Sequence, residues 1–170
     1  TTMIDTSEQV LAEAPSQGRR RAATITATRA AKSPASEAKK TLSIQRTFSD
    51  PKTHPFDQVE WERRIAEIAD DAGKVVFKQD NVEVPKEWSQ LATKVVVSKY
   101  FYGEQGTPER ETSVRQLIHR ICRTIADWGV KDGYFTKAGG EVFYDELTWL
   151  CLNQYGAFNS PIWFNVGLHH

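Results

Sequence analysis

The sequence predicts a mainly helical module with a small β element, an α+β fold. Two stretches, 114–128 and 142–151, carry apolar residues three and four positions apart, a spacing that places them on one face of a helix. Two short valine-rich runs within residues 75–84 are typical of strands. The 170 residues favour one domain, and a 39% hydrophobic content, with eight Phe, five Trp and five Tyr, allows a core.

The two helical stretches have recognisable ends. Thr112 or Ser113 can cap the first helix, and Gly129 can end it. The second helix is expected to follow Gly139 and Gly140. The apolar face of the first comprises Val114, Leu117, Ile118, Ile121, Cys122, Ile125 and Trp128, and that of the second comprises Val142, Phe143, Leu147, Leu150 and Cys151.

The preceding region is less regular. Asp57 and Glu60 have the spacing of a capping box, and apolar residues then recur at helical intervals, so the sequence predicts a helix that ends near Ala72. Residues 75–77 and 82–84 are predicted to pair as a hairpin.

Two further segments complete this region. Pro85 suits the first turn of a short helix through about Leu91. For residues 95–102 the pattern leaves strand and helix open.

The chain divides into a tail, residues 1–47, and a folded domain, residues 48–170. The segment 1–45 contains no Phe, Trp or Tyr, so it cannot bury enough apolar surface to offset its chain entropy. A disordered, mildly basic tail is predicted. Its three consecutive arginines, 19–21, have no aromatic neighbours and indicate no specific nucleic-acid partner.

Composition and charge exclude several classes of protein. The net charge of +0 gives no general attraction to nucleic acid or an anionic membrane. No run approaches the roughly 18 apolar residues that span a bilayer, and no secretory signal begins the chain. A cytoplasmic protein without a membrane partner is expected, in which Cys122 and Cys151 are reduced core thiols.

No catalytic or metal-binding set is complete within the sequence. The four histidines, His54, His119, His169 and His170, lack the spacing of metal ligands on one element, and His119 is expected to be a solvated or capped surface residue. Asp145 and Glu146 face different sides of a helix and make a poor acid and base pair. We therefore predict neither a catalytic residue nor a metal ligand here.

Residues 158–167 combine polar and large apolar side chains. Asn159, Ser160 and Asn165 lie among aromatic and aliphatic residues, and an unpaired polar group in a core costs about 1–3 kcal/mol. A segment that only fills a core would not be expected to carry three of them. The mixture predicts the wall of a buried site.

Several segments have the order and composition of one known family. They are residues 92–101, 111–118, 123–129, 143–150 and 158–167. Together they resemble the N-terminal region of adenosylcobalamin-dependent, class II ribonucleotide reductases. Segment 158–167 is the most specific, because such chains combine Asn-Ser-Pro with Phe-Asn-x-Gly at the entrance to the catalytic barrel. The resemblance implies that this module, residues 48–170, precedes a ten-stranded α/β barrel.

The resemblance also implies an activity. Enzymes of this family convert ribonucleotides to deoxyribonucleotides for DNA synthesis and repair, using adenosylcobalamin, a cysteine radical and a thioredoxin-type reductant. Their catalytic cysteines come after the Phe-Asn-x-Gly segment, so the cofactor is expected in the remainder of the enzyme and this chain is expected to be inert alone. The remainder can be covalently joined to this chain or be the other half of a split protein, and both alternatives stay open. A ribonucleoside-diphosphate reductase is expected, although the residues leave diphosphate and triphosphate substrates open.

Segment 158–167 supplies the candidate site residues. Related reductases place Ser or Thr before Pro near the substrate phosphates, so the resemblance implies substrate binding by Ser160, flanked by Asn159 and Pro161. Asn159 and Asn165 are expected to satisfy backbone groups, with Phe158, Trp163 and Phe164 packed beneath. A turn-forming role without a ligand stays open for Ser160. For the whole chain, a stand-alone helical interaction or regulatory module and a pseudo-enzyme remnant also stay open.

Overall fold

The computed structural model describes residues 40–168. In chain order the elements are η1 (Pro55–Asp57), β1 (Trp61–Ala69), β2 (Val75–Pro85), α1 (Gln90–Lys99), α2 (Val114–Lys131), α3 (Lys137–Leu152) and α4 (Ser160–Asn165). The four helices and the two-stranded sheet of this range confirm the α+β prediction. Residues 1–39 of the tail predicted for residues 1–47, and the two final histidines, His169 and His170, lie outside the described residues. The barrel stays a prediction.

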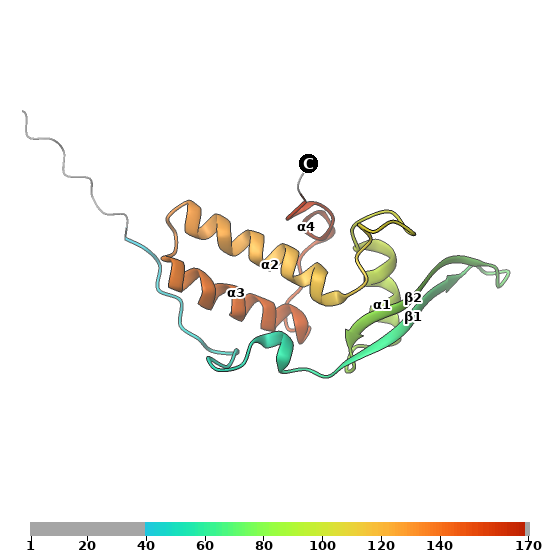
Figure 1. Cartoon of the computed structure of the whole chain (residues 1–170), viewed down its shortest axis with the longest axis horizontal. Coiled ribbons are helices and arrows are strands. Elements are labelled where there is room, and N and C mark those ends of the chain that lie inside the picture. The colour runs from blue at the N-terminus through green and yellow to red at the C-terminus, as the bar shows by residue number, and fades with distance from the viewer. Residues whose placement is uncertain (1–39, 169–170) are drawn as a thin grey trace, which may run out of the picture. The chain divides into compact units, whose positions relative to one another are not determined.

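The helices α2 and α3 pack side by side in opposite directions (Figure 1). Ser113 caps α2, since its Oγ accepts from Arg115 N–H at 3.0 Å, and the side chain of Gln116 accepts from Ser113 N–H at 3.1 Å. The predicted apolar stripe is buried from Val114 to Cys122, with Leu117, Ile118 and Ile121 at most 1% exposed, but its last member, Trp128, is 50% exposed. The helix and its cap are confirmed.

The glycines near the α2–α3 turn were assigned the wrong role. Gly129 lies inside α2, and Gly139 and Gly140 lie inside α3. A Cβ on Gly140 would come within 2.4 Å of Val130 Cγ2, and one on Gly129 within 2.5 Å of the Phe135 ring. These glycines allow close packing, so they do not mark the helix ends.

The helix predicted to end near Ala72 is wrong, because residues 61–69 form strand β1. β1 pairs antiparallel with β2, with Trp61 opposite Pro85 and Ile68 opposite Phe77. Residues 78–81, predicted as the turn, lie inside β2, which is one continuous strand. The turn comes earlier, where Asp70 Oδ1 accepts from the N–H groups of Ala72 and Lys74 at 3.0 and 2.9 Å. Pairing with the next strand of the hairpin outweighs the local helical periodicity.

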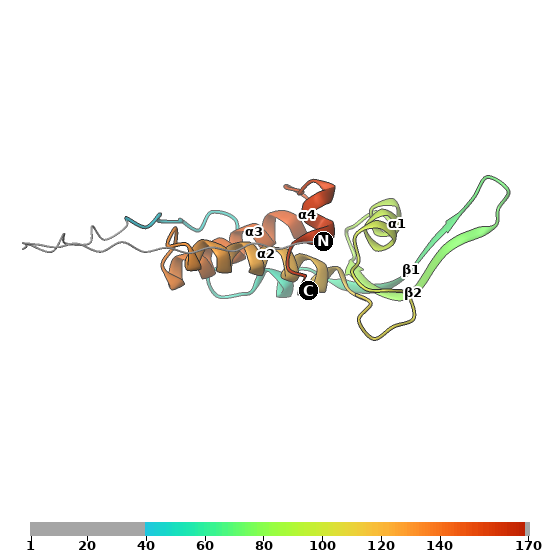
Figure 2. The ribbon, with the colours of Figure 1, turned by 90° about the horizontal axis from the view of Figure 1, so that it is seen from above.

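Helix α1 covers part of the region, residues 95–102, for which the sequence left strand and helix open. The short helix predicted from Pro85 is wrong, because Pro85 ends β2 and the first helical residue is Gln90. Ser89 caps α1 by accepting from Ala92 N–H at 3.0 Å. The helical alternative for residues 95–102 is confirmed as far as Lys99. Figure 2 shows α1 beside the base of the hairpin, whose tip extends further.

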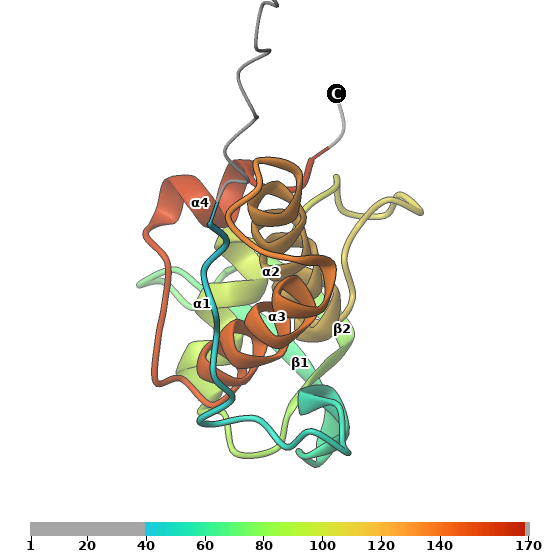
Figure 3. The ribbon, with the colours of Figure 1, turned by 90° about the vertical axis from the view of Figure 1, so that its left-hand side faces the viewer.

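The residues before Phe48 already contact the folded domain, although the sequence placed the start of order there. Leu42 N–H donates to Tyr134 O at 2.7 Å, and Arg46 pairs with Asp145 at 2.7 Å. Figure 3 shows this part of the chain passing along α3. We call residues 42–49 the N-terminal strap.

Glu146 holds the strap to α3. Its carboxylate accepts from the backbone N–H groups of Thr47, Phe48 and Ser49 at 2.9, 3.0 and 2.8 Å. Burial by itself raises the pKa of Glu146, but these hydrogen bonds and one from the Ser49 hydroxyl outweigh it and lower the pKa below its usual value. Glu146 is therefore a structural anchor for the strap.

Candidate functional site

The candidate site is the α4 segment, residues 158–167. It begins with Asn159 at the N-cap, where the side chain makes no capping hydrogen bond. Two side chains of the segment hydrogen-bond to its own backbone. Trp163 Nε1–H donates to Phe158 O at 2.6 Å, and Asn165 Nδ2–H donates to Pro161 O at 2.8 Å. The prediction that these two asparagines satisfy backbone groups is confirmed for Asn165. It is wrong for Asn159, whose side chain does not cap the helix.

A buried ion pair fixes the end of the α4 segment. Arg120 of α2 donates from Nε to Glu111 Oε1 at 2.8 Å, and the two side chains are only 11% and 8% exposed. Arg120 Nη1 also donates to Val166 O at 2.6 Å, while Glu111 Oε2 accepts from Tyr102 N–H at 2.8 Å. One guanidinium therefore ties α2, the loop before it and the α4 segment together.

Gly167 completes this anchor. Its backbone has φ +78°, and a Cβ there would come within 2.6 Å of Arg120 Cγ and of Arg120 O. A glycine is required both for the left-handed conformation and for the close approach. The conformation of the segment end therefore depends on direct contact with α2.

The hydroxyl of Ser160 lies at the surface. It is 3.1 Å from the hydroxyl of Tyr100, the C-cap residue of α1, and either group can donate. Ser160, Asn159 and Pro161 are all exposed. The prediction of a buried wall is therefore wrong for the described chain, in which no residue of α4 is buried.

The aromatic residues of the segment behave in two ways. Phe158 and Trp163 pack against the core, as predicted, with their rings 5.5 Å apart and edge-on. Phe164 does not, since it is 46% exposed, although its ring centroid is 5.3 Å from that of Tyr100. The segment has one face on the core and one face toward solvent.

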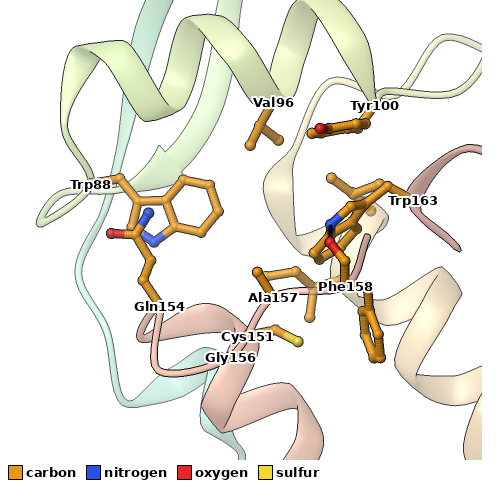
Figure 4. Close-up of a pocket in the computed structure, with 11 residues that line it drawn as sticks. Trp88, Val96, Tyr100, Cys151, Gln154, Gly156, Ala157, Phe158 and Trp163 are labelled. Atoms are coloured by element: carbon orange, nitrogen blue, oxygen red, sulfur yellow. Dashed lines mark hydrogen bonds between the residues drawn. The ribbon is translucent and has the colours of Figure 1, made fainter. Parts of the chain in front are cut away.

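An apolar cavity of about 230 Å³ lies between α1, α3 and the α4 segment. Figure 4 shows Trp88, Tyr100 and Trp163 on its walls, with Cys151 at its floor. The volume is below the roughly 300–1,000 Å³ of sites for drug-sized ligands, and a corrin is larger still. The cavity therefore does not fit a cobalamin.

The two cysteines are free and buried, which confirms that they are core thiols. Cys122 is 0% and Cys151 5% exposed. Contact with Cys151 together with burial raises the pKa of Cys122 far above its usual range. Cys122 is therefore a protonated packing residue at neutral pH.

His119 lies at the surface with its ring partly covered, and its contact with Tyr144 agrees with the expectation of a solvated or capped surface histidine. Its Nδ1 is 2.7 Å from the Tyr144 hydroxyl. Burial, with a contribution from Arg123, lowers the pKa of His119, and burial raises the pKa of Tyr144 to about 12. Among residues 40–168, no three His, Cys, Asp or Glu side chains lie close enough to hold a metal ion.

Three residues that hold the site were missed from sequence. Tyr100, Glu111 and Arg120 come from three separate parts of the chain, and only folding brings them to the α4 segment. One signal was available for Arg120, a charged residue at the border of the apolar stripe, one turn after Leu117.

Within the described residues 40–168, no helix is long and apolar enough to cross a membrane.

The fold and the site define an α+β module that carries an anchored, exposed polar segment, and comparison with known sequences gives its family. A family model described as "Class II vitamin B12-dependent ribonucleotide reductase" matches residues 62–154. The chain belongs to this family and corresponds to its N-terminal region.

Individual relatives agree with this assignment. The chain is 63% identical over 117 residues to the vitamin B12-dependent ribonucleotide reductase of Rhodopirellula baltica, an alignment that covers 68% of this chain and 11% of that protein. It is 43% identical over 141 residues to the enzyme of the same name from Streptomyces coelicolor, covering 82% and 15%. The chain thus spans only 11–15% of the length of these curated relatives.

Proposed function

We propose that this chain is the N-terminal part of an adenosylcobalamin-dependent ribonucleotide reductase that makes deoxyribonucleotides for DNA synthesis and repair. Family membership supports this proposal. The cofactor and the radical and reducing cysteines belong to the remainder of the enzyme, which works in the cytoplasm with a thioredoxin-type reductant. The chain alone is inert, which agrees with the burial of both its cysteines in the core.

Within that enzyme, Ser160 donates its hydroxyl to a phosphate oxygen of a ribonucleoside-diphosphate substrate. The observation that carries this proposal is the exposed Ser160 hydroxyl on a segment whose end is fixed by the buried Arg120–Glu111 pair. Such pre-positioning lowers the ordering entropy lost on binding. Asn159 and Pro161 shape the turn that presents the hydroxyl.

The test uses a hybrid reductase, in which this chain replaces the matching stretch of the Rhodopirellula baltica enzyme. Ser160→Ala should raise KM roughly 10- to 100-fold, because a hydrogen bond to a charged group contributes about 1.5–3 kcal/mol. Ser98→Ala is the matched control, since the Ser98 hydroxyl only donates to Val95 O within α1. An unchanged KM for Ser160→Ala would make Ser160 a turn residue without a ligand.

The same hybrid tests the function as a whole. An active hybrid that loses ribonucleotide reduction when residues 48–170 are removed supports the proposal. If the folded hybrid is inactive while the parent enzyme is active, the chain does not serve as the reductase segment, and the stand-alone interaction module becomes the better explanation.

A further inference from the structure

Helix α1 carries apolar residues on its solvent side as well as on its core side. Thr93 and Val97 face the core and are 0% exposed, and Val96 lines the aromatic cavity. The solvent side carries Leu91 and Val95, which are 71% and 41% exposed, together with the charged Lys99. Leu91 and Val95 are four positions apart, so they are neighbours on the helix surface, and nothing in the described residues covers them.

The neighbouring strand borders this surface. Gln90 of α1 donates from Nε2 to Ile65 O of β1 at 2.8 Å, which places the backbone of Ile65 next to the start of α1. The strands β1 and β2 pair only with each other as a sheet among the described residues. A two-stranded sheet is marginally stable without packing partners. We call Leu91 and Val95 the α1 face.

The outer side of α2 and α3 is different. Arg123 pairs with Asp127 and with Glu141, each at 2.9 Å, and both carboxylates are more than half exposed. One large apolar residue of α2, Trp128, is 50% exposed. This side has the charged surface expected of a face that stays in water.

We propose that the α1 face docks on the remainder of the same reductase polypeptide, an inference that rests on the proposed function. The length of the relatives argues for this occupant, because the chain spans only 11–15% of them and most of such a polypeptide lies outside it. The charged residues of α1 are Lys94 and Lys99. The docking surface of the remainder is therefore apolar at its centre and acidic at its rim.

Docking at the α1 face also bears on the candidate site. Tyr100 caps the C-terminal end of α1, and its hydroxyl meets that of Ser160. Fixing α1 against the remainder therefore fixes one hydrogen-bond partner of Ser160 relative to that remainder.

Cysteine labelling tests the docking directly. Leu91→Cys introduces one exposed thiol, while Cys122 and Cys151 are buried and give a low background that the unsubstituted chain measures. Trp128→Cys is the matched control on α2. In the isolated 170-residue chain both thiols should react quickly with a maleimide. In the hybrid reductase, Leu91→Cys should react at least tenfold more slowly, and Trp128→Cys at the same rate as before.

The outcomes separate this inference from the proposed function. An active hybrid in which Leu91→Cys reacts as fast as in the isolated chain overturns the docking and leaves the function standing. A folded but inactive hybrid overturns the function and, with it, the docking. If labelling of the isolated chain slows as its concentration rises, the occupant is a second copy, and the proposal is overturned.

A charge substitution provides a second measurement. Leu91→Glu should leave the melting temperature of the isolated chain unchanged, since that side chain is mostly in water, and should lower the melting temperature of the hybrid by several degrees. Trp128→Glu should change the melting temperatures of the isolated chain and of the hybrid by the same amount. Equal melting temperatures for Leu91→Glu and the unsubstituted hybrid would contradict the docking.

Discussion

The α2–α3 pair and the α4 segment are held in place by different forces. The pair is held by apolar side chains that are almost completely buried, among them Leu117, Ile118 and Ile121. The α4 segment has no buried residue within its helix; it packs against the core through Phe158 and Trp163, and the buried pair of Arg120 with Glu111 fixes its end. The first region is a scaffold held by its apolar interior, and the second is a surface segment that polar contacts fix at its end.

The largest expected effect comes from removing the polar anchor. Arg120→Ala leaves Glu111 buried without its cation, which typically destabilises a protein by about 3–5 kcal/mol. Urea unfolding of the isolated chain measures the change. Arg63→Ala is the control, because Arg63 is 55% exposed and 4.0 Å from Glu83, and such pairs contribute about 1 kcal/mol or less. Equal effects of the two substitutions would contradict the anchor.

The scaffold is tested by two leucines in different environments. Leu117→Ala should lower the free energy of unfolding by about 2–5 kcal/mol, since a buried side chain is replaced by a cavity. Leu91→Ala should change it by less than about 0.5 kcal/mol, because Leu91 is 71% exposed and Leu117 only 1%. Similar losses in the isolated chain would mean that the α1 face is already covered there.

The strap should respond to pH through Glu146. Because the pKa of Glu146 is lowered in the folded chain, its stabilisation is fully present above the unfolded pKa of about 4.5 and is lost as the pH falls through the folded pKa. Glu146→Gln should therefore lower the melting temperature at pH 7, and the difference from the unsubstituted chain should shrink toward pH 3. Exposed Glu109 gives the control, Glu109→Gln. A difference that stays constant with pH would exclude this role of the carboxylate.

The smallest effect is expected at the contact between α1 and α4. Tyr100→Phe removes the hydrogen-bond partner of Ser160 and should raise KM of the hybrid reductase roughly two- to tenfold, as expected for one neutral hydrogen bond. The free energy of unfolding of the isolated chain should change little. Tyr134→Phe, at an exposed tyrosine remote from α4, should leave KM unchanged. If both tyrosine variants have normal KM values, Tyr100 does not position Ser160.

The sequence predicted the fold best where a helix carries its own signals. Ser113 and the apolar stripe of α2 are local features, and the structure confirms the resulting helix and cap. The strand β1 could not be predicted in the same way, since its partner lies in residues 75–85 and its apolar spacing also fits a helix. Glycines were misjudged because the close packing at Gly140 depends on Val130 of another helix.

The position of the candidate site could be predicted from the sequence, but its anchoring contacts and its exposure could not. The unusual mixture of Asn159, Ser160 and aromatic residues indicated the α4 segment, and the resemblance gave it a role that stays a prediction. The buried anchor could not be foreseen, because Val166 lies 46 residues after Arg120 and meets the Arg120–Glu111 pair only after folding. Exposure of the segment was also missed, since burial depends on what covers a residue as well as on its type.

The attachment of the strap to α3 sets a practical limit for anyone who shortens this chain. Cutting at residue 48, the boundary expected from composition, would remove the Arg46–Asp145 pair and the N–H group of Thr47. Glu146 would then lose part of the hydrogen bonding that offsets its burial. A fragment intended for crystals or binding assays should begin before Leu42, so that the acidic residues of α3 keep their partners.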